Sequence, residues 1–395
     1  MKILTFTTLF PNAVQPHHGV FVENRQRYLR ASGQVEARVV APVPWFPFTS
    51  KMFGSYGDFA RIPAREERHG VIIEHPRYAL IPKVGMTLTP KFMYQGTRGT
   101  IRRILDEGYD FDVIDAHYFY PDGVAAAMLA NEFNKPLTIT ARGTDLNLIP
   151  QYPKPRRMIQ WCAERADHMM TVCQALKDSL LELGVADDRV TVLRNGVNLE
   201  NFVPRNREDS RHRLGIHDDR RLLSSVGHLI ERKGHEIVIG AMPHLPDAHL
   251  VIVGDGPEDA ALKALAVELG VEDRVDFLGR RPHEELSWIY SASDALVLAS
   301  SREGWANVLL EAMACGTPVV ASNIWGTPEV VTAPEAGRLM ADRTPKALAD
   351  AAKDLFGTYP DRAMTRAYAE RFSWDDTTEG QLRIFGDLME SAKSV

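Results

Sequence analysis

The chain has 395 residues, of which 45% are hydrophobic and 25% are charged. This length is enough for about two or three domains with sizeable cores. Its 46 lysines and arginines against 52 aspartates and glutamates give a net charge of −6, which excludes a broadly basic nucleic-acid-binding protein. Residues 1–205 are net basic and the rest net acidic. The positive charge of the first half has two interpretations. It could favour an anionic partner, or it could belong to an ordinary solvated surface.

The cysteines and the apolar segments indicate the cellular setting. Cys162, Cys173 and Cys315 are too few for a disulfide framework and lack metal-ligand spacing, so we expect packed, reduced thiols. Residues 1–10 contain no apolar run typical of a signal peptide, and no apolar stretch is long enough to span a membrane. We therefore expect a cytoplasmic protein, with the inner face of the cell membrane as a second setting.

Short apolar runs alternate with amphipathic stretches along the whole chain. In the first half the predicted strands are 3–8, 38–43, 71–73, 113–115, 137–140, 169–172 and 190–193. In the second half they are 222–226, 250–253, 275–278, 295–298, 319–321 and 338–340. Predicted helices between them include 22–29, 258–269 and 345–356. Buried strands separated by helices indicate parallel sheets, and two such series predict two Rossmann-like, doubly wound α/β domains.

A polar, proline-containing stretch at 201–213 interrupts this periodicity. We therefore predict an N-terminal domain over 1–205, completed by a C-terminal helix at 375–395, and a second domain over 206–374.

Two segments of the first half combine aromatic, apolar and basic residues. The first, 42–63, contains six aromatic residues together with Lys51 and Arg61, and loops of that length are uncommon unless they are functional or disordered. The second, 81–103, includes Pro82, Lys83, Met86, Leu88, Lys91, Phe92, Tyr94, Arg98, Arg102 and Arg103. Such mixtures can seat a helix in a lipid interface, here an anionic membrane. The alternative is that both segments pack their aromatic residues onto their own domain.

The strongest signal for chemistry lies between two predicted strands, at 300–320. Glu303 follows the strand 295–298, at the carboxyl end where doubly wound sheets bind ligands, and Glu311 lies about one turn into the next helix. The first turn of that helix offers backbone N–H groups and a positive dipole end. Either glutamate alone would more often be a surface or salt-bridge residue. Together they suit a ligand with hydroxyls at both ends and phosphates between, which is the layout of a nucleotide-sugar.

The segment from Glu303 through Glu311, EGWANVLLE, resembles the signature of the family 4 retaining glycosyltransferases, and the resemblance covers essentially the whole chain. It implies the GT-B fold, with two Rossmann-like doubly wound parallel-sheet domains facing across a cleft. It also implies that Glu303 holds hydroxyls of the donor sugar and Glu311 the ribose hydroxyls. Further donor contacts are expected from the loop between them, at Gly304, Trp305, Ala306, Asn307 and Val308.

A basic turn after the strand 222–226 supplies the expected diphosphate site. Family members place an Arg after the first glycine and a Lys further along, and here Gly227 and Lys233 match. His228 stands at the Arg position, and a neutral imidazole would supply no charge. Either His228 or Arg232 is expected to contact the diphosphate in place of that Arg. The strand end 277–282, which includes Arg281, resembles the segment whose backbone contacts the nucleobase.

The first half resembles the family more loosely. Gly19 follows the first strand, where a glycine lets the backbone approach a phosphate, although a plain turn glycine is the alternative. His117 closes the strand that begins at 113 and matches the family position near the reacting end of the donor. Arg142, Asp145 and Asn195 follow later strands and are expected on the acceptor side.

These residues imply a hexosyltransferase-type enzyme with His117, Glu303, Lys233 and Arg232 as its catalytic groups. No Asp-x-Asp pair stands at a strand end, so we expect metal-independent transfer and no cofactor. The donor is expected to be a UDP-sugar, with GDP-mannose as the second candidate, and the acceptor a saccharide or a lipid-linked saccharide in surface-glycan synthesis. A non-catalytic two-lobed nucleotide-sugar-binding protein and a GT-B sugar-nucleotide epimerase remain alternatives.

Overall fold

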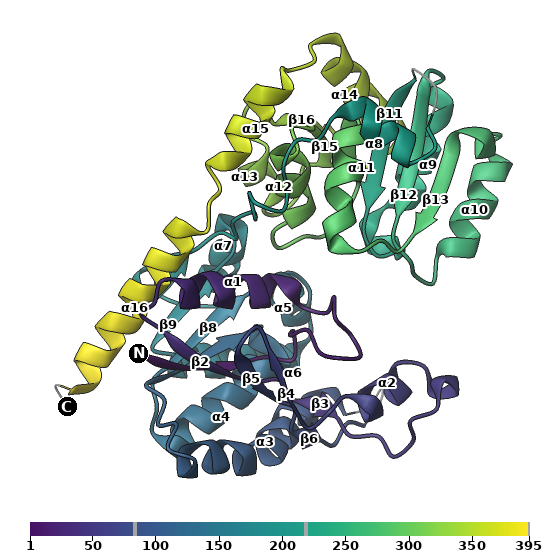
Figure 1. Cartoon of the computed structure of the whole chain (residues 1–395). Coiled ribbons are helices and arrows are strands. Elements are labelled where there is room, and N and C mark those ends of the chain that lie inside the picture. The colour runs from purple at the N-terminus through teal and green to yellow at the C-terminus, as the bar shows by residue number, and fades with distance from the viewer. Residues whose placement is uncertain (82–84, 217–219, 394–395) are drawn as a thin grey trace. The chain divides into compact units, whose positions relative to one another are not determined.

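The computed structural model describes residues 1–81, 85–216 and 220–393 (Figure 1). It divides into two compact units, Met1–Arg194 with Asp375–Val395 (unit 1) and Asn195–Trp374 (unit 2). The segment 195–205, expected in the first domain, therefore belongs to unit 2. There the Val197 amide donates to the Phe372 carbonyl oxygen at 3.0 Å, and the Arg366 guanidinium donates to the carbonyl oxygen of Phe202 at 2.5 Å.

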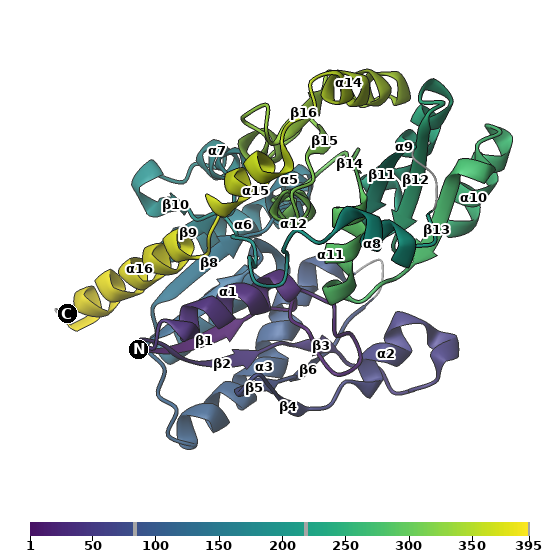
Figure 2. The same ribbon diagram turned by 45° about the horizontal axis from the view of Figure 1, so that its top comes forward.

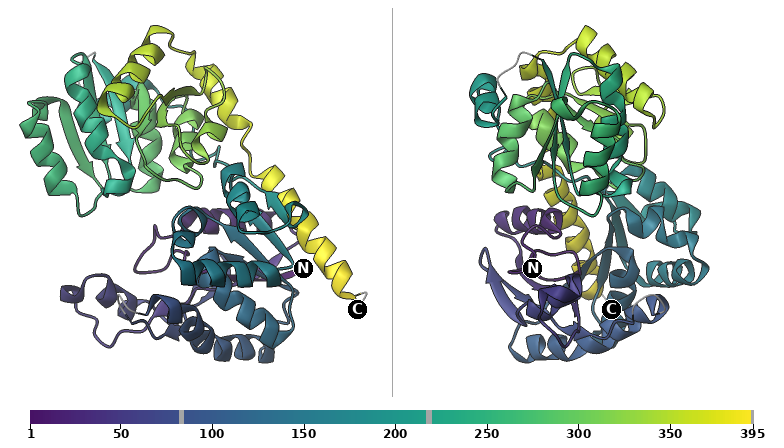
Figure 3. Two further views of the ribbon diagram at one scale, coloured as in Figure 1. Left: turned by 180° about the vertical axis from the view of Figure 1, so that it is seen from behind. Right: turned by 90° about the vertical axis from the view of Figure 1, so that its right-hand side faces the viewer.

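Unit 1 is an α/β structure with helices on both faces of an eight-stranded sheet (Figure 3). Its strands are β1 (Lys2–Phe6), β2 (Glu36–Val40), β3 (Val43–Pro44), β4 (Arg65–Arg68), β5 (Val71–Glu74), β6 (Arg77–Tyr78), β7 (Val113–His117), β8 (Leu137–Ala141), β9 (His168–Thr171) and β10 (Val190–Val192). Its helices are α1 (Val20–Ala31), α2 (Ser55–Arg61), α3 (Thr89–Asp106), α4 (Val124–Phe133), α5 (Thr144–Asn147), α6 (Pro153–Arg165), α7 (Gln174–Glu182) and α16 (Asp375–Lys393). Short helical turns are η1 (Lys51–Phe53), η2 (Met86–Leu88), η3 (Phe119–Gly123), η4 (Ile149–Gln151) and η5 (Asp187–Arg189).

The sheet of unit 1 runs in the order β10-β9-β8-β7-β1-β2-β5-β4, so the chain changes direction of winding between β1 and β7. The pairs from β10 to β5 are parallel, as the sequence predicts, but β4 pairs antiparallel with β5. This exception arises from a tight turn at His69 and Gly70, both with positive φ. A strand of only charged residues at a sheet edge escapes a search for apolar runs.

The segment 42–63 is more structured than the predicted loop, because it contains β3, η1 and α2. It extends from the body of unit 1 (Figures 1 and 3). The helix α3 does not present its apolar face outward, since Met93, Ile101 and Ile104 are buried and α3 packs on α4 and β6. For α3, therefore, the alternative of packing onto its own domain holds.

The C-terminal helix α16 completes unit 1 and runs beside α1 (Figures 1 and 2). Ile384 and Phe385 join the buried cluster around Ile3. The fully buried Arg25 of α1 donates from Nε to the side-chain oxygen of Gln381 on α16 at 2.9 Å. Burial lowers the pKa of Arg25 to about 10, so it stays charged at neutral pH, and its hydrogen bonds stabilise the buried charge.

Unit 2 has a six-stranded parallel sheet in the order β13-β12-β11-β14-β15-β16. Its strands are β11 (Arg221–Val226), β12 (Ala248–Val253), β13 (Val275–Gly279), β14 (Ala295–Leu298), β15 (Val319–Ser322) and β16 (Gly337–Met340). Its helices are α8 (Arg207–Arg213), α9 (His235–Ala241), α10 (Asp259–Glu268), α11 (Leu286–Ala292), α12 (Asn307–Ala314), α13 (Thr327–Val330), α14 (Pro345–Gly357) and α15 (Arg362–Glu370). Short turns are η6 (Glu231–Lys233), η7 (Met242–His244), η8 (Glu272–Arg274) and η9 (His283–Glu285). The two predicted doubly wound sheets are therefore present.

Candidate functional site

In unit 2 the predicted residues gather at the carboxyl ends of β11 and β14. These strands are neighbours, and the winding reverses between them, which is where such sheets bind ligands. Gly234 brings the two loops together. Its φ is +72°, and a Cβ atom there would lie 2.1 Å from the carbonyl oxygen of Ala299. Only glycine allows this approach, which places η6 beside the loop that carries Glu303.

A cation–carboxylate cluster forms at this contact. Lys233 Nζ donates to Glu303 Oε1 at 2.7 Å, and the Ser300 hydroxyl donates to the same oxygen at 2.7 Å. Arg232 Nη1 lies 3.5 Å from that oxygen and donates to the carbonyl oxygen of Arg302 at 2.8 Å. The structure thus brings together three of the four predicted catalytic residues, Lys233, Arg232 and Glu303.

The Glu303 carboxylate is held in its charged form. Burial alone would raise its pKa, but the nearby charges of Lys233 and Arg232 and the hydrogen bonds from Lys233 and Ser300 outweigh burial and lower the pKa. An ionised carboxylate accepts hydrogen bonds only, so it suits the hydroxyl groups of a sugar.

The loop from Glu303 to the start of α12 at Asn307 is contacted by Asn195, which was expected on the acceptor side. Asn195 lies in unit 2, where its carbonyl oxygen accepts from Trp305 Nε1 at 3.1 Å and its Nδ2 donates to Asn307 Oδ1 at 3.3 Å. The Asn307 amide donates to the Trp305 carbonyl oxygen at 3.1 Å and so closes a turn within the loop. The donor contacts expected at Gly304, Trp305, Ala306, Asn307 and Val308 stay predictions.

Glu311, on α12, is held by two side chains that the sequence did not single out. Its Oε1 lies 3.2 Å from His283 Nε2, and its Oε2 accepts from the Tyr290 hydroxyl at 3.0 Å. His283 belongs to η9 and Tyr290 to α11. No motif marks these two residues, because they come to Glu311 through the packing of α11, which follows η9 directly, against α12.

The remaining predicted donor residues of unit 2 are more exposed. His228 Nδ1 donates to the Asp255 carbonyl oxygen at 2.5 Å, which ties the turn after Gly227 to the turn after β12. Arg281 lies after β13, with its guanidinium 3.8 Å from the Glu285 carboxylate. Between the two residues considered for the missing Arg, Arg232 is the one beside Glu303.

In unit 1 the predicted residues lie at the carboxyl ends of β1, β7 and β8. Gly19 precedes α1 with a φ of +70°, and a Cβ atom there would lie 2.3 Å from the backbone of Leu9. The glycine therefore lets the chain fold back on the loop after β1 and begin α1 there.

His117, which is expected near the reacting end of the donor, is buried and has a polar contact on each ring nitrogen. Only 2% of it is exposed. Arg142 Nη2 lies 2.6 Å from His117 Nδ1, and Asp115 Oδ2 lies 3.2 Å from Nε2. Because a guanidinium only donates, Nδ1 must accept and Nε2 must carry the proton. Burial, opposed by Asp115, lowers the pKa of His117 to about 4, so the ring is neutral at pH 7 and orients Arg142.

Asp145 supports the same edge of the sheet from α5. Its carboxylate accepts from the amides of Phe119 at 2.9 Å, Arg142 at 3.1 Å and Gly143 at 2.7 Å. It therefore fixes the loops after β7 and β8 rather than presenting a carboxylate to a ligand.

Sequence reasoning did not assign Ser300, Asp115 or Arg25. Asp115 stands two residues before His117 on β7, so both side chains lie on one face of the strand, and this spacing could have linked them. Arg25 could not have been recognised, because its partners lie on β9, on α16 and at Leu193.

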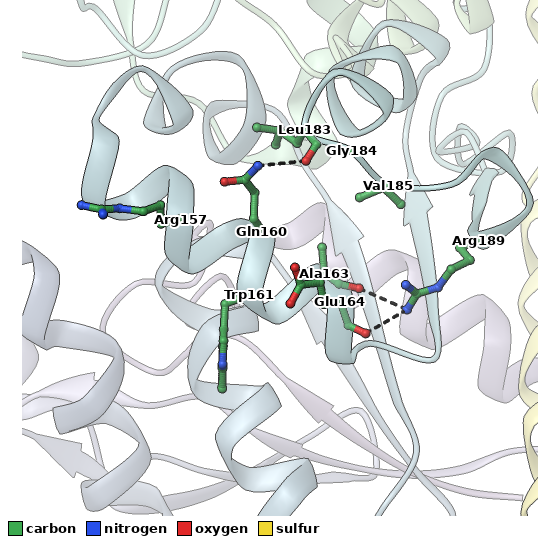
Figure 4. A pocket seen from close by; sticks show the side chains of 9 residues that line it. All are labelled: Arg157, Gln160, Trp161, Ala163, Glu164, Leu183, Gly184, Val185 and Arg189. Carbon is green, nitrogen blue, oxygen red and sulfur yellow. Dashed lines mark hydrogen bonds between the residues drawn. The ribbon is translucent and has the colours of Figure 1, made fainter.

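One hollow in unit 1 lies apart from these residues. It is lined from α6 by Arg157, Gln160, Trp161, Ala163 and Glu164 and from the other side by Leu183, Gly184, Val185 and Arg189 (Figure 4). Gln160 donates to the Leu183 carbonyl oxygen at 3.0 Å and Arg189 to the Ala163 carbonyl oxygen at 3.2 Å. These two polar side chains therefore hydrogen-bond to backbone carbonyl oxygens, and no predicted site residue lines the hollow.

Two further features concern metals and membranes. Within 1–81, 85–216 and 220–393, no group of three or more His, Cys, Asp and Glu side chains is arranged to hold a metal ion. None of the helices described in those ranges is long and apolar enough to cross a membrane. The three cysteines are buried and form no disulfide.

The segment around α2 exposes apolar side chains. Trp45 is 60% exposed and Met52 82% exposed, and the rings of Phe46, Phe48 and Phe53 contact one another. Further exposed apolar residues around η2 are Ile81, Met86 and Leu88. Trp45 and Ala79 directly follow β3 and β6, which are parallel neighbours, so both segments leave the same end of that small sheet. We call the exposed residues of both segments the apolar rim: Trp45, Phe48, Met52, Phe53, Ile81, Met86 and Leu88.

Several of the basic residues expected to accompany this rim pair with carboxylates. Arg98 and Arg102 pair with Glu132, and Arg103 pairs with Glu74 and Glu107. Arg61 pairs with Asp58, and Lys51 and Lys91 are exposed. Pro82 and Lys83 lie outside the described residues.

Comparison with known families gives two matches that together cover most of the chain. Residues 21–201 match the model described as Glycosyltransferase Family 4, and residues 206–372 match the model described as Glycosyl transferases group 1. The boundary between the two models lies at 201–206.

Individual proteins are similar over most of their length. The D-inositol 3-phosphate glycosyltransferase of Stackebrandtia nassauensis is 30% identical over 356 residues, covering 83% of this chain and 80% of the relative. The putative teichuronic acid biosynthesis glycosyltransferase of Bacillus subtilis is 28% identical, with 82% of each chain covered. The structure of Anabaena HepE in complex with UDP-glucose has a TM-score of 0.71 at 20% identity over the full length of both chains, which is a likeness of fold.

Proposed function

Because the chain belongs to the family 4 glycosyltransferases, we propose that it transfers a sugar from a nucleotide-diphosphate donor to an acceptor hydroxyl. In this proposal the transfer retains the configuration of the sugar and needs no metal ion. The observation that carries it is the contact of Lys233 and Arg232 with Glu303 at the reversal between β11 and β14. The donor sugar lies on Glu303, and the diphosphate lies beside the two cations.

The two cations would stabilise the departing nucleotide. Negative charge grows on the phosphate oxygen as the bond to the sugar breaks, and fixed positive groups in a site that excludes water stabilise that charge strongly. Lys233 is held at Glu303, and Arg232 is held at the carbonyl oxygen of Arg302, so both are in place before the donor binds.

Glu303 is assigned to substrate binding and not to nucleophilic attack. Lys233 and Ser300 both donate to Oε1, which fixes the carboxylate as a hydrogen-bond acceptor for sugar hydroxyls. The acceptor hydroxyl would then attack from the face that the nucleotide leaves, and the leaving phosphate would take its proton. A product with inverted anomeric configuration would overturn this part of the proposal.

The donor is tested by nucleotide release in the presence of EDTA. UDP-glucose, UDP-GlcNAc, UDP-glucuronate, UDP-galactose and GDP-mannose form the panel, with UDP-sugars tested first because HepE, which shares the fold, was solved with UDP-glucose. Release from one donor with EDTA present is the expected result. Activity that EDTA abolishes and Mg²⁺ restores would refute metal independence, and a failure of every nucleotide-sugar to bind would refute the proposal itself.

For the acceptor we propose a lipid-linked saccharide in surface-glycan synthesis. One relative is named for teichuronic acid biosynthesis, and the apolar rim lies in the unit expected to bind acceptor. Exposed aromatic and apolar side chains with Lys51 and Lys91 beside them fit peripheral contact with an anionic membrane. The proposed contact involves the rim and not α3, whose apolar face is buried.

Vesicle sedimentation tests this contact. The full-length protein is expected to sediment with vesicles of phosphatidylglycerol and phosphatidylcholine at low salt, and Met52→Ser together with Trp45→Ser should reduce the bound fraction. The matched control is Met364→Ser, which removes a 57% exposed methionine from unit 2. The rim would be excluded as the membrane contact if the rim variant bound vesicles as well as the wild type. It would also be excluded if Met364→Ser reduced the bound fraction as much as the rim variant does.

A further inference from the structure

The Glu311 carboxylate is held by protein donors on both oxygens. His283 Nε2 lies 3.2 Å from Oε1, and the Tyr290 hydroxyl donates to Oε2 at 3.0 Å. Each oxygen of a carboxylate accepts about two hydrogen bonds, so each has one position left. Two free positions side by side match two hydroxyls on adjacent carbons, as in a ribose ring.

Both donors are themselves fixed. Tyr290 is fully buried, and its backbone carbonyl oxygen accepts from the Thr317 hydroxyl at 2.6 Å. The His283 ring meets the buried ring of Phe202 edge-on, with 5.0 Å between their centroids. Torsion about the terminal bond of a glutamate side chain is otherwise broad, so these two contacts select one orientation of the carboxylate plane.

The protonation of both donors supports this arrangement. Burial and the neighbouring Glu311 raise the pKa of Tyr290 far above its usual value, so the hydroxyl keeps its proton. Burial alone would lower the pKa of His283, but Glu311 and the nearby charge of Glu284 raise it. Protonated His283 therefore donates to Oε1 over a wider pH range than an ordinary histidine.

We propose that His283 and Tyr290 are positioning residues that orient Glu311 for the two ribose hydroxyls of the donor and so set the preference for ribonucleotides. This inference rests on the proposed function, because it assumes that Glu311 meets a ribose. Neither residue needs to touch the ligand. Their effect is expected in the discrimination between ribose and 2′-deoxyribose and not in the chemical step.

The test measures binding of UDP and 2′-deoxy-UDP, and of GDP and 2′-deoxy-GDP, by titration calorimetry. The wild type is expected to prefer the ribose form, and Tyr290→Phe should reduce that preference by about tenfold, the effect of losing one hydrogen bond to a charged group. Tyr359→Phe is the matched control, because it removes a hydroxyl that donates to the Asp294 carbonyl oxygen at 2.8 Å elsewhere in unit 2. The control should keep the wild-type preference.

His283 is tested with two substitutions. His283→Ala should reduce the preference as Tyr290→Phe does, whereas His283→Gln, which keeps a neutral donor, should restore part of it. In the wild type the preference should weaken as pH rises through the raised pKa of His283, and His283→Gln should remove that pH dependence.

The outcomes separate this inference from the proposed function. Wild-type discrimination with the same ribose preference in Tyr290→Phe and His283→Ala would overturn the inference alone. Equal weakening of the ribose and deoxyribose forms would show a merely structural role and would also overturn it. A wild type that binds none of the four nucleotides would overturn the proposed function, and this inference with it.

Discussion

Replacing Lys233 with methionine tests the cation–carboxylate cluster most directly. The ammonium donates to Glu303 Oε1 at 2.7 Å, and only 15% of the lysine side chain and 9% of the glutamate side chain are exposed. A hydrogen bond to a charged group contributes about 1.5–3 kcal/mol. Because Arg232 and Ser300 remain beside the carboxylate, we expect Lys233→Met to lower the free energy of unfolding by about 2 kcal/mol, towards the low end of that range.

The control is the same substitution at an exposed pair. Lys263 donates to Asp259 at 2.7 Å, but the two side chains are 53% and 44% exposed. Such a pair along one helix contributes about 0.3–0.5 kcal/mol. Urea unfolding of both variants at pH 7.5 measures the difference. Equal free energies of unfolding in Lys233→Met and Lys263→Met would refute the reasoning that the first pair is shielded from water.

The pH dependence of stability gives a second readout of the same change. The folded-state pKa of Glu303 is lowered, so its charge adds stability above the unfolded pKa of about 4.5, and this stability is lost as pH falls through the folded pKa. In Lys233→Met the positive charge of Lys233 no longer opposes the effect of burial on Glu303, so the pKa of Glu303 rises. The loss of stability as pH falls below about 4.5 should therefore shrink. If Lys233 also stabilises the leaving nucleotide, transfer should fall by about a hundredfold or more.

Three other predictions follow from single residues. Glu303→Ala should lower transfer more than tenfold by removing hydrogen bonds of about 1.5–3 kcal/mol, and an unchanged rate, with Glu268→Ala as control, would take Glu303 out of the site. His117 should stay neutral in the folded protein down to about pH 4. The unfolded chain takes up this proton near pH 6.5, so the free energy of unfolding should fall as pH drops from about 6.5 to about 4. A pKa near 6.5 for His117, measured by NMR, would contradict its burial. Gly19→Ala should cost about 1–3 kcal/mol of stability by chemical denaturation, and more than Gly33→Ala, where φ is +72° but a Cβ atom meets nothing within 4 Å.

Much of the fold follows from local sequence pattern. Strands such as β11, β12 and β14 are apolar runs buried in their sheet, and their spacing predicts helices between them. β4 was missed because a charged edge strand has no apolar pattern, and its turn at His69 and Gly70 is the only local sign of it. The orientation of α3 was ambiguous because amphipathic helices that face lipid and those that face a core share one periodicity.

The site was predictable only where a residue's place on the sheet determines its role. Glu303 could be located because it lies in the loop that follows β14. The contact of Arg142 with His117 and the partners of Glu311 depend on which elements become neighbours, and no spacing in the sequence encodes that β7 lies beside β8 or that α11 packs on α12. For the same reason the contacts of Asn195 with Trp305 and Asn307 in unit 2 could not be read from the sequence, since they cross more than a hundred residues.

The pairing of α16 with α1 also has a consequence for the order of events during synthesis. A ribosome makes unit 1 up to Arg194 first, then all of unit 2, and only afterwards the helix that carries Gln381 and Phe385. Until that helix emerges, Arg25 lacks its Gln381 partner and the cluster around Ile3 lacks Phe385. Nascent unit 1 is thus incomplete while unit 2 is being translated. Loss of α16 would therefore destabilise unit 1, although unit 1 begins to be made first.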